Sequence, residues 1–231
     1  MQGDVVRKRC RVMQLGMTEY NTAYSVQKDL VAKRIRGEIP DTLILLEHEP
    51  VFTVGRSGSS SNILINEEGR LKEKIALFEV DRGGDVTYHG PGQLVGYPIF
   101  DLNGYGRDIH RFLRLLEEVI INVLAEYGLE ALRVPGFTGV WVGKKKIASI
   151  GVGVKKWVSF HGLSLNVAPD MKHFSFINPC GLRHGTMTSM GELLGYDVRV
   201  EDVQEKVIKS FSKVFEVNCQ PSDDLCRGSI Y

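Results

Sequence analysis

The sequence has few cysteines, almost no net charge and no long hydrophobic run. Four cysteines in 231 residues are too few and too scattered for the disulfide framework of a small secreted protein. Lys+Arg 29 against Asp+Glu 28 leaves a net charge of +1, which provides no general attraction to nucleic acid or to a membrane surface. The most apolar stretch, 119–125, is interrupted by Asn122 and is too short to cross a bilayer. No secretory signal is visible, so we expect a cytoplasmic protein with neither a nucleic-acid nor a membrane partner.

Helical and strand-like patterns follow one another without an internal repeat or a break in composition. Apolar residues recur at helical spacing over 18–36, with Thr18 as the expected cap, and over 108–127. Possible capping boxes, Ser189 with Glu192 and Asp202 with Glu205, predict two more helix starts. Strand-like runs are predicted at 10–15, 43–46, 51–54, 76–80, 94–100, 138–142, 146–154 and 157–167. The last three alternate around short turns, which indicates an antiparallel meander. The predicted fold class is α+β, a mixed or antiparallel sheet with flanking helices, in a single domain over residues 1–231.

Residues 82–93 are the densest candidate site. Four glycines and a proline interrupt regular structure there and hold polar side chains close together, so a ligand could approach backbone N–H groups directly. The alternative is a surface turn that is polar by accident. The segment is not a phosphate loop, since the pattern G-x-x-x-x-G-K-[ST] occurs nowhere in the chain. A second stretch rich in glycine and serine, 55–62, is a candidate lid.

Lys146 is a candidate general base because of its phase in the predicted strand 146–154. It shares a face with Ala148, Ile150, Val152 and Val154, which are all apolar. Burial there, and the neighbouring lysines, would lower the pKa of the amine and let it accept a proton near neutral pH. The alternative is a lysine at the strand end that extends its amine to water.

Cys180 is a candidate nucleophile. Pro179 and Gly181 place it in a turn outside regular structure, where a thiol can be accessible. Most free cysteines are small buried hydrophobic residues, so the assignment needs a nearby lysine or histidine to activate the thiolate. Cys10, Cys219 and Cys226 have no comparable surroundings and are interpreted as structural.

The remaining charged and histidine residues give weaker signals. Cys180 and His184 supply only two possible metal ligands, and no H-E-x-x-H motif is present, so no metal is expected. The segment 144–156 contains five lysines and no acidic residue. It could dock an acidic partner, or it could be an ordinary solvated hairpin.

Four segments taken in order, 82–93, 143–151, 159–166 and 178–181, resemble the octanoyltransferases of lipoate biosynthesis. The block Arg-Gly-Gly-x-x-Thr-Tyr-His-Gly-Pro-Gly-Gln is specific to that family, and the resemblance covers the chain from about Val12 to Val217. It implies the fold of the biotin and lipoate protein ligase catalytic domain. It also implies an acyltransferase without a cofactor or metal, which moves an octanoyl group from octanoyl-acyl carrier protein to a lysine of lipoyl domains. The acceptors would be 2-oxoacid dehydrogenases and the glycine-cleavage H protein.

The resemblance also joins the two isolated candidates. It implies that Cys180 forms the acyl thioester and that Lys146 works with it, so we expect their side chains within hydrogen-bond reach or one water of it. Other matching positions would line the acyl-binding site: Arg82, Gly83, Gly84, Asp85, Val86, Thr87, Tyr88, His89, Ser149, Ile150, Gly151, Gly162, Leu163 and Ser164.

Two other functions stay open at this point. An ATP-dependent lipoate or biotin protein ligase of the same fold would activate a free acid and need no cysteine. A noncatalytic protein that binds the acyl carrier or lipoyl domain would use the lysines of 144–156 and bind in a salt-sensitive way. A cysteine hydrolase is less favoured, because water would have to outcompete the acceptor lysine.

Overall fold

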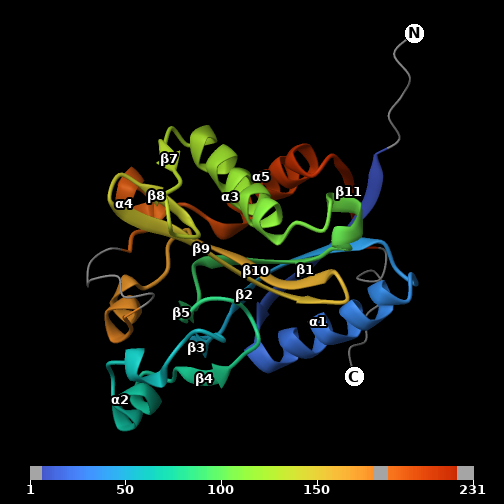
Figure 1. The fold of residues 1–231 in the computed structure, drawn as a ribbon. Helices are drawn as coiled ribbons and strands as arrows, with labels where there is room; N and C mark the ends of the chain where they lie inside the picture. Colours follow the sequence, from blue (N-terminus) through green and yellow to red (C-terminus); the bar gives the residue numbers. More distant parts are fainter. Residues whose placement is uncertain (1–6, 179–186, 223–231) are drawn as a thin grey trace.

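The computed structural model describes residues 7–178 and 187–222, and its central element is a mixed sheet of eight strands (Figure 1). The strand order is β11-β1-β2-β6-β10-β9-β8-β7. Strands β11, β1 and β2 run parallel, and the other neighbouring pairs are antiparallel. The bounds are β1 Lys8–Thr18, β2 Asp41–His48, β6 Gln93–Ile99, β7 Ala131–Leu132, β8 Val140–Val142, β9 Lys145–Lys155, β10 Val158–Asn166 and β11 Val217–Pro221.

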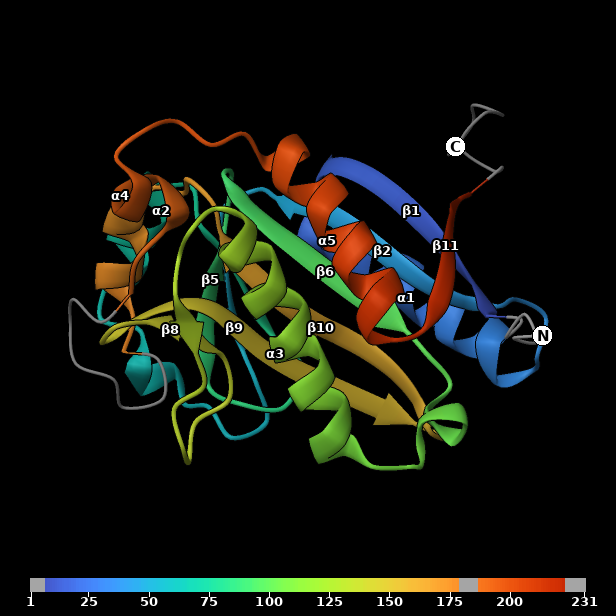
Figure 2. The ribbon, with the colours of Figure 1, turned by 90° about the horizontal axis from the view of Figure 1, so that it is seen from above.

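Helices cover both faces of this sheet. Helices α3 (Ile109–Glu126) and α5 (Val200–Val214) lie side by side over one face, and α1 (Tyr20–Ile35) covers the other (Figure 2). Strand β2 shows why two helical layers are needed, because its side chains are apolar on both faces. Leu43 and Leu45 pack in the core under α3 and α5, whereas Ile44 and Leu46 pack in the core under α1.

A small second sheet lies beside the main one and has the order β4-β3-β5. Its strands are β3 (Val51–Val54), β4 (Ala76–Glu79) and β5 (Val86–His89). It has a separate apolar core that contains Phe52, Tyr88 and Phe174. The shorter helices are η1 Ser60–Asn62, α2 Glu67–Lys72, η2 Leu102–Tyr105, η3 Met171–Phe176 and α4 Met190–Leu194.

The predicted α+β class with a mixed sheet and flanking helices is confirmed, as are the two long helices and the meander. Of the predicted helix starts, Ser189 is confirmed, because its hydroxyl accepts from the Glu192 N–H at the start of α4, and two others are wrong. The first helix is capped by Glu19, whose carboxylate accepts from the backbone N–H groups of Asn21 and Thr22, and not by Thr18. The last helix begins at Val200, because Asp202 pairs with Arg199 instead of serving as the cap. Within the described ranges, no helix is long and apolar enough to span a bilayer.

Three buried histidines lie around the junction of β2, β5 and β10. The ring of His48 bonds the Thr18 carbonyl at 2.8 Å and the Tyr97 hydroxyl at 2.7 Å. His161 bonds the Asp81 carboxylate at 2.9 Å, and His89 lies with its ring centroid 5.7 Å from that of His48. Burial lowers the pKa of His48 and of His161 to about 4, and that of His89 to about 3. All three imidazoles are therefore neutral at physiological pH.

This burial predicts a steep loss of stability in mild acid. Below about pH 6.5 the unfolded histidines bind protons that the folded ones do not bind until pH 4 or lower, so the free energy of unfolding must fall as pH falls through this window. Each histidine contributes a slope of up to about 1.4 kcal/mol per pH unit. Urea unfolding at several pH values between 7.5 and 4.5 measures this slope directly. A free energy of unfolding that stays constant over the range would contradict the buried neutral state.

Candidate functional site

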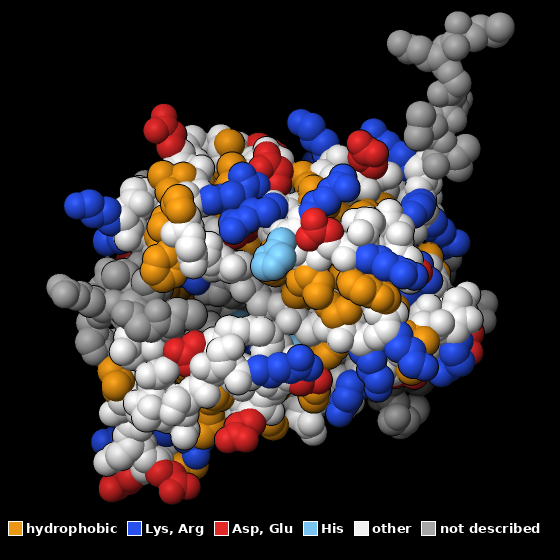
Figure 3. Space-filling model, viewed as in Figure 1, with side chains coloured by type: hydrophobic (Ala, Val, Ile, Leu, Met, Phe, Trp, Pro, Cys, Tyr) orange, Lys and Arg blue, Asp and Glu red, His pale blue; other side chains and the backbone are white. Residues whose placement is uncertain are grey.

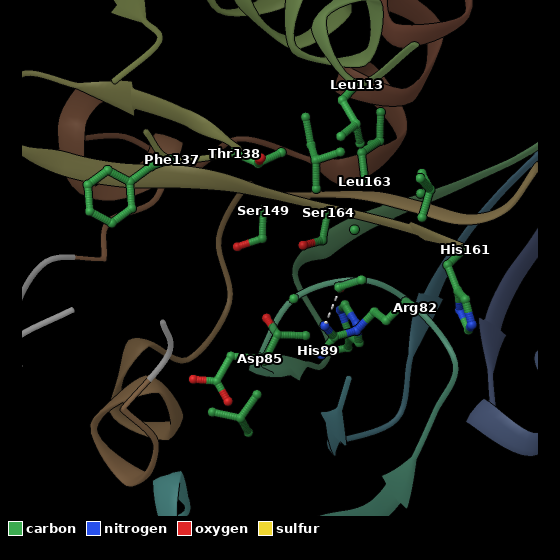
Figure 4. A pocket seen from close by; sticks show the side chains of 18 of the residues that line it. Arg82, Asp85, His89, Leu113, Phe137, Thr138, Ser149, His161, Leu163 and Ser164 are labelled. Carbon is green, nitrogen blue, oxygen red and sulfur yellow. Dashed lines mark hydrogen bonds between the residues drawn. The ribbon is translucent and has the colours of Figure 1, made fainter. Parts of the chain in front are cut away.

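The main candidate site is a cavity of about 490 Å³ between the two sheets. Loop 82–85 and β5 form one wall, and β9 and β10 form the opposite wall (Figure 4). Ser149 and Ser164 point from the second wall toward Arg82 and His89, as Figure 4 shows. These two serines are direct cross-strand neighbours. The volume is in the range of small-molecule sites.

A glycine on β9 lets the walls approach each other. The N–H of Gly83 donates to the Val152 carbonyl at 2.9 Å, which ties loop 82–85 to β9. A Cβ atom on Gly151 would lie only 2.7 Å from the Gly83 carbonyl oxygen, and Gly162 is the residue opposite Gly151 on β10. A side chain at Gly151 would therefore push the first wall away from the second.

Most of the predicted substrate-binding residues line this cavity. They are Arg82, Gly83, Gly84, Asp85, Val86, Thr87, His89, Ser149, Ile150, Gly151, Gly162, Leu163 and Ser164. Tyr88 does not. Its ring is fully buried in the core of the small sheet, and its hydroxyl bonds the His173 ring at 2.8 Å. Tyr88 faces the opposite side of β5 from Thr87 and His89. Val86 shares the face of Tyr88 and packs in the same small core, but it also borders the cavity at the start of the strand.

Arg82 and Asp85 hold the cavity wall together. The Arg82 guanidinium donates to the carbonyl and hydroxyl oxygens of Thr53 at 2.8 and 2.9 Å, and so joins the loop to β3. The Asp85 carboxylate accepts from the Asn62 side chain at 2.7 Å and from the Ser59 N–H at 3.4 Å. The segment 55–62, predicted as a candidate lid, is thus tied to the cavity wall by hydrogen bonds.

A chain of buried hydrogen bonds runs from His89 across the sheet. Gln93 donates its amide N–H to Asn166 at 2.8 Å, so its oxygen accepts from His89 Nδ1 at 2.6 Å. His89 Nδ1 therefore carries the proton, and Nε2 is left as an acceptor on a residue that lines the cavity. Asn166 donates to the Thr188 carbonyl at 2.9 Å, and the Thr188 N–H donates to the Lys146 carbonyl at 2.9 Å. The chain links β5, β6, β10 and β9.

Lys146 lines the same cavity and is only 6 % exposed. The burial predicted from the strand phase is confirmed, and the alternative with the amine extended to water is wrong. Its Nζ lies 5.0 Å from the centroid of the Trp141 ring. A Cβ atom built on Gly139 would lie 3.1 Å from that Nζ, so the Gly139 backbone packs closely against the amine.

Cys180 lies outside the described residues, so its distance to Lys146 stays a prediction. The described residues on either side of it can be placed. The N–H of Asn178 donates to the Asn62 carbonyl at 2.8 Å, next to the segment held by Asp85. Met187 pairs with Lys146 through the backbone in an isolated parallel β-bridge. The described residues on either side of Cys180 are therefore held beside the cavity, Asn178 through Asn62, which bonds Asp85, and Met187 through Lys146.

The predicted lysine cluster is divided by the structure. Lys145 and Lys155 are the first and last residues of β9, which places them roughly 33 Å apart at about 3.3 Å per residue. Lys146 is buried. The lysines of this meander therefore do not form one patch.

Lys and Arg side chains lie on both sides of a shallow hollow on the face viewed in Figure 3, with exposed apolar side chains close by.

Several cavity-lining residues were not predicted from the sequence. The apolar ones come mainly from α3 and the loop before β8, and the polar ones include His161 from β10. The unpredicted residues are Tyr20, Tyr97, Ile109, Leu113, Gly136, Phe137, Thr138, Val152 and His161. Those on helices and strands follow patterns that a purely structural role explains equally well, and Gly136 and Phe137 lie in a loop for which no element was predicted. Within the described ranges, no three His, Cys, Asp or Glu side chains converge to hold a metal ion.

Comparison with known proteins gives consistent matches over most of the chain. The family model described as the lipoyl protein ligase A/B catalytic domain matches residues 19–212. An octanoyltransferase of Caldicellulosiruptor saccharolyticus is 53 % identical over 209 residues, which cover 90 % of this chain and 89 % of the relative. An octanoyltransferase of Solibacter usitatus is 45 % identical over 221 residues, which cover 96 % of this chain and 100 % of the relative.

Solved structures support the same fold at low sequence identity. A lipoate-protein ligase A bound with ATP superposes with a TM-score of 0.75 at 20 % identity, over 93 % of this chain and 88 % of that one. A biotin protein ligase from Aquifex aeolicus in complex with biotin and ATP gives a TM-score of 0.53 at 13 % identity, over 90 % of this chain and 71 % of that one. The chain therefore belongs to the lipoyl protein ligase A/B catalytic domain family, and within it is an acyltransferase of the octanoyltransferase kind.

Proposed function

We propose that this protein is one catalytic domain that transfers an octanoyl group in two steps through a thioester on Cys180. The donor is octanoyl-acyl carrier protein. The acceptor is a lysine of lipoyl domains, including those of 2-oxoacid dehydrogenases and the glycine-cleavage H protein, in the cytoplasm. The observation that carries the proposal is the buried Lys146 amine in a cavity to which Asn178 and Met187 are both anchored.

In the first step the Cys180 thiol gives its proton to the Lys146 amine, and the thiolate attacks the carbonyl carbon of the donor thioester. The new carbon–sulfur bond replaces the old one, and the carrier thiolate takes the proton from Lys146 as it leaves. One thioester is exchanged for another, so the step needs no ATP. In the second step the acceptor amine attacks the Cys180 thioester. The amide forms, Lys146 takes the amine proton, and it returns a proton to the Cys180 sulfur.

The cavity can accommodate the acyl chain. Ile109, Leu113 and Leu163 give it apolar walls, and its volume of about 490 Å³ exceeds the need of an eight-carbon chain. Burying the seven carbons beyond the carbonyl at roughly 0.8 kcal/mol each would contribute about 5–6 kcal/mol to binding. One methylene discriminates by only about 1–3 kcal/mol, so the preference for octanoyl over neighbouring lengths should be modest.

The thioester is tested by intact-protein mass spectrometry after incubation with octanoyl-acyl carrier protein and no ATP. The wild type should gain the mass of one octanoyl group and lose it when apo lipoyl domain is added, since the acceptor amine resolves the thioester. Cys180→Ala should gain nothing. Cys219→Ser is the matched control, because this half-buried thiol lies on the edge strand β11 and should leave acylation intact.

Three results would contradict this scheme. An adduct that persists in Cys180→Ala would place the acyl group elsewhere. If the wild type forms no adduct, and the domain is modified only from free octanoate with ATP, the protein is a ligase. Domain binding without any covalent product would leave only a binding function.

The role of Lys146 is tested by the rate of the first step. We expect Lys146→Ala to slow Cys180 acylation by about 10²–10⁴-fold, the usual contribution of a positioned general base. Lys146→Arg should be similarly slow, since a guanidinium does not give up its proton near neutral pH. Lys145→Ala, the exposed neighbour on the same strand, should stay within about twofold of the wild type. If Lys146→Ala and Lys146→Arg acylate Cys180 as fast as Lys145→Ala and the wild type, Lys146 is not the base.

A further inference from the structure

Glu117 is a carboxylate buried in an otherwise apolar stripe of α3. Its side chain is fully buried, and its neighbours along the helix, Leu116 and Val119, belong to the core under α3. A charge in such a place is costly unless it is paired and hydrogen-bonded. Both oxygens have partners. Oε2 accepts from Arg114 at 2.6 Å and from Arg133 at 2.9 Å, and Oε1 accepts from the backbone N–H of Gly139 at 3.0 Å.

The hydrogen bond to Gly139 links this carboxylate to the candidate base. Gly139 has a φ of +137°, which an L side chain rarely adopts. A Cβ atom at this position would lie 2.5 Å from Lys146 Cε and 3.1 Å from Nζ. The Gly139 backbone therefore touches the end of the Lys146 side chain, while the Trp141 ring lies 5.0 Å from the same Nζ.

We propose that Glu117 is a positioning residue for the acyl transfer, which holds Gly139 and through it sets the place of the Lys146 amine. The inference rests on the proposed function, because it matters for catalysis only if Lys146 moves the proton. Glu117 touches neither the acyl group nor the cysteine. It acts at one remove, by fixing the loop that precedes β8. A displacement of about 1 Å in a catalytic group can cost on the order of 10²-fold in rate.

The neighbouring Glu118 gives a natural comparison. It accepts from Arg133 at 2.6 Å, but its side chain is 41 % exposed, and none of its hydrogen bonds among the described residues reaches Gly139. If Glu117 only neutralises arginines, the two glutamates differ in their effect on stability alone. If Glu117 positions Lys146, it also affects the rate of proton transfer, and Glu118 does not.

A double-mutant cycle separates these roles. The rate of Cys180 acylation by octanoyl-acyl carrier protein is followed by quenching and intact mass spectrometry in wild type, Glu117→Gln, Lys146→Ala and the double variant, with Glu118→Gln as control. A glutamine has one acceptor oxygen where the carboxylate has two, so it cannot accept from Gly139 and from both guanidinium groups at once. Thermal melting of each variant confirms that it is folded.

We expect Glu117→Gln to slow acylation at least tenfold when Lys146 is present and less than twofold when residue 146 is alanine. Glu118→Gln should remain within twofold of the wild type. The same factor in both backgrounds, or no effect of Glu117→Gln, would overturn the inference while the role of Lys146 stands. If Lys146→Ala acylates Cys180 at the wild-type rate, the role of Lys146 is overturned, and the inference with it.

A second variant covers the case in which Glu117→Gln does not fold. Glu117→Asp keeps the charge for Arg114 and Arg133 but shortens the side chain, so it cannot reach Gly139 at the same time. It should fold and still slow acylation by a factor that disappears in the Lys146→Ala background. If Glu117→Asp acylates at the wild-type rate, the bond to Gly139 does not position the base.

Discussion

The site depends on the close approach of loop 82–85 to strand β9. The backbone bond from Gly83 to Val152 sets this distance, and the absence of a side chain at Gly151 permits it. Because the loop is also fixed to β3 through Arg82, the approach joins the small sheet to the main one. The cavity lies between two walls whose separation is set by backbone contacts. Unlike side chains, backbone atoms have no alternative rotamers, so this separation is fixed. In the proposed function, such walls would keep their spacing when the acyl chain enters or leaves.

Polar groups around this junction are arranged to be neutral. His48, His89 and His161 are buried and uncharged, and their partners are hydroxyl, carbonyl and amide groups and one carboxylate, Asp81. Neutral donors and acceptors can be buried at lower cost than charges, provided that each is bonded. In the proposed function, this arrangement lets the apolar acyl chain lie beside neutral imidazoles. The buried Arg82 guanidinium is the exception, since it stays charged while it donates to Thr53 on the side of β3.

Local patterns predicted most of the elements and much of the cavity. The glycine-rich block 82–93 and the phase of Lys146 are signals within a few residues, so the sequence alone carries them. The errors have a common origin in tertiary contacts. Tyr88 was placed in the site because it lies inside the motif, yet strand alternation and the partner His173 turn it into the small core. Glu117 and Gly139 are 22 positions apart, and nothing in either local sequence indicates that they meet.

The indirect action of Glu117 follows from what a proton carrier requires. A carboxylate in direct contact with Lys146 would stabilise the ammonium form and oppose the transfer of its proton. The two guanidinium groups of Arg114 and Arg133 balance the charge of Glu117, whose remaining oxygen holds only a backbone N–H. Gly139, which carries no charge, then fixes the position of the Lys146 side chain by packing against it. The absence of a Cβ at Gly139 is essential to this arrangement, since any side chain would occupy the space of Lys146 Cε. An anion can thus orient a base from a distance at which it does not favour the protonated form.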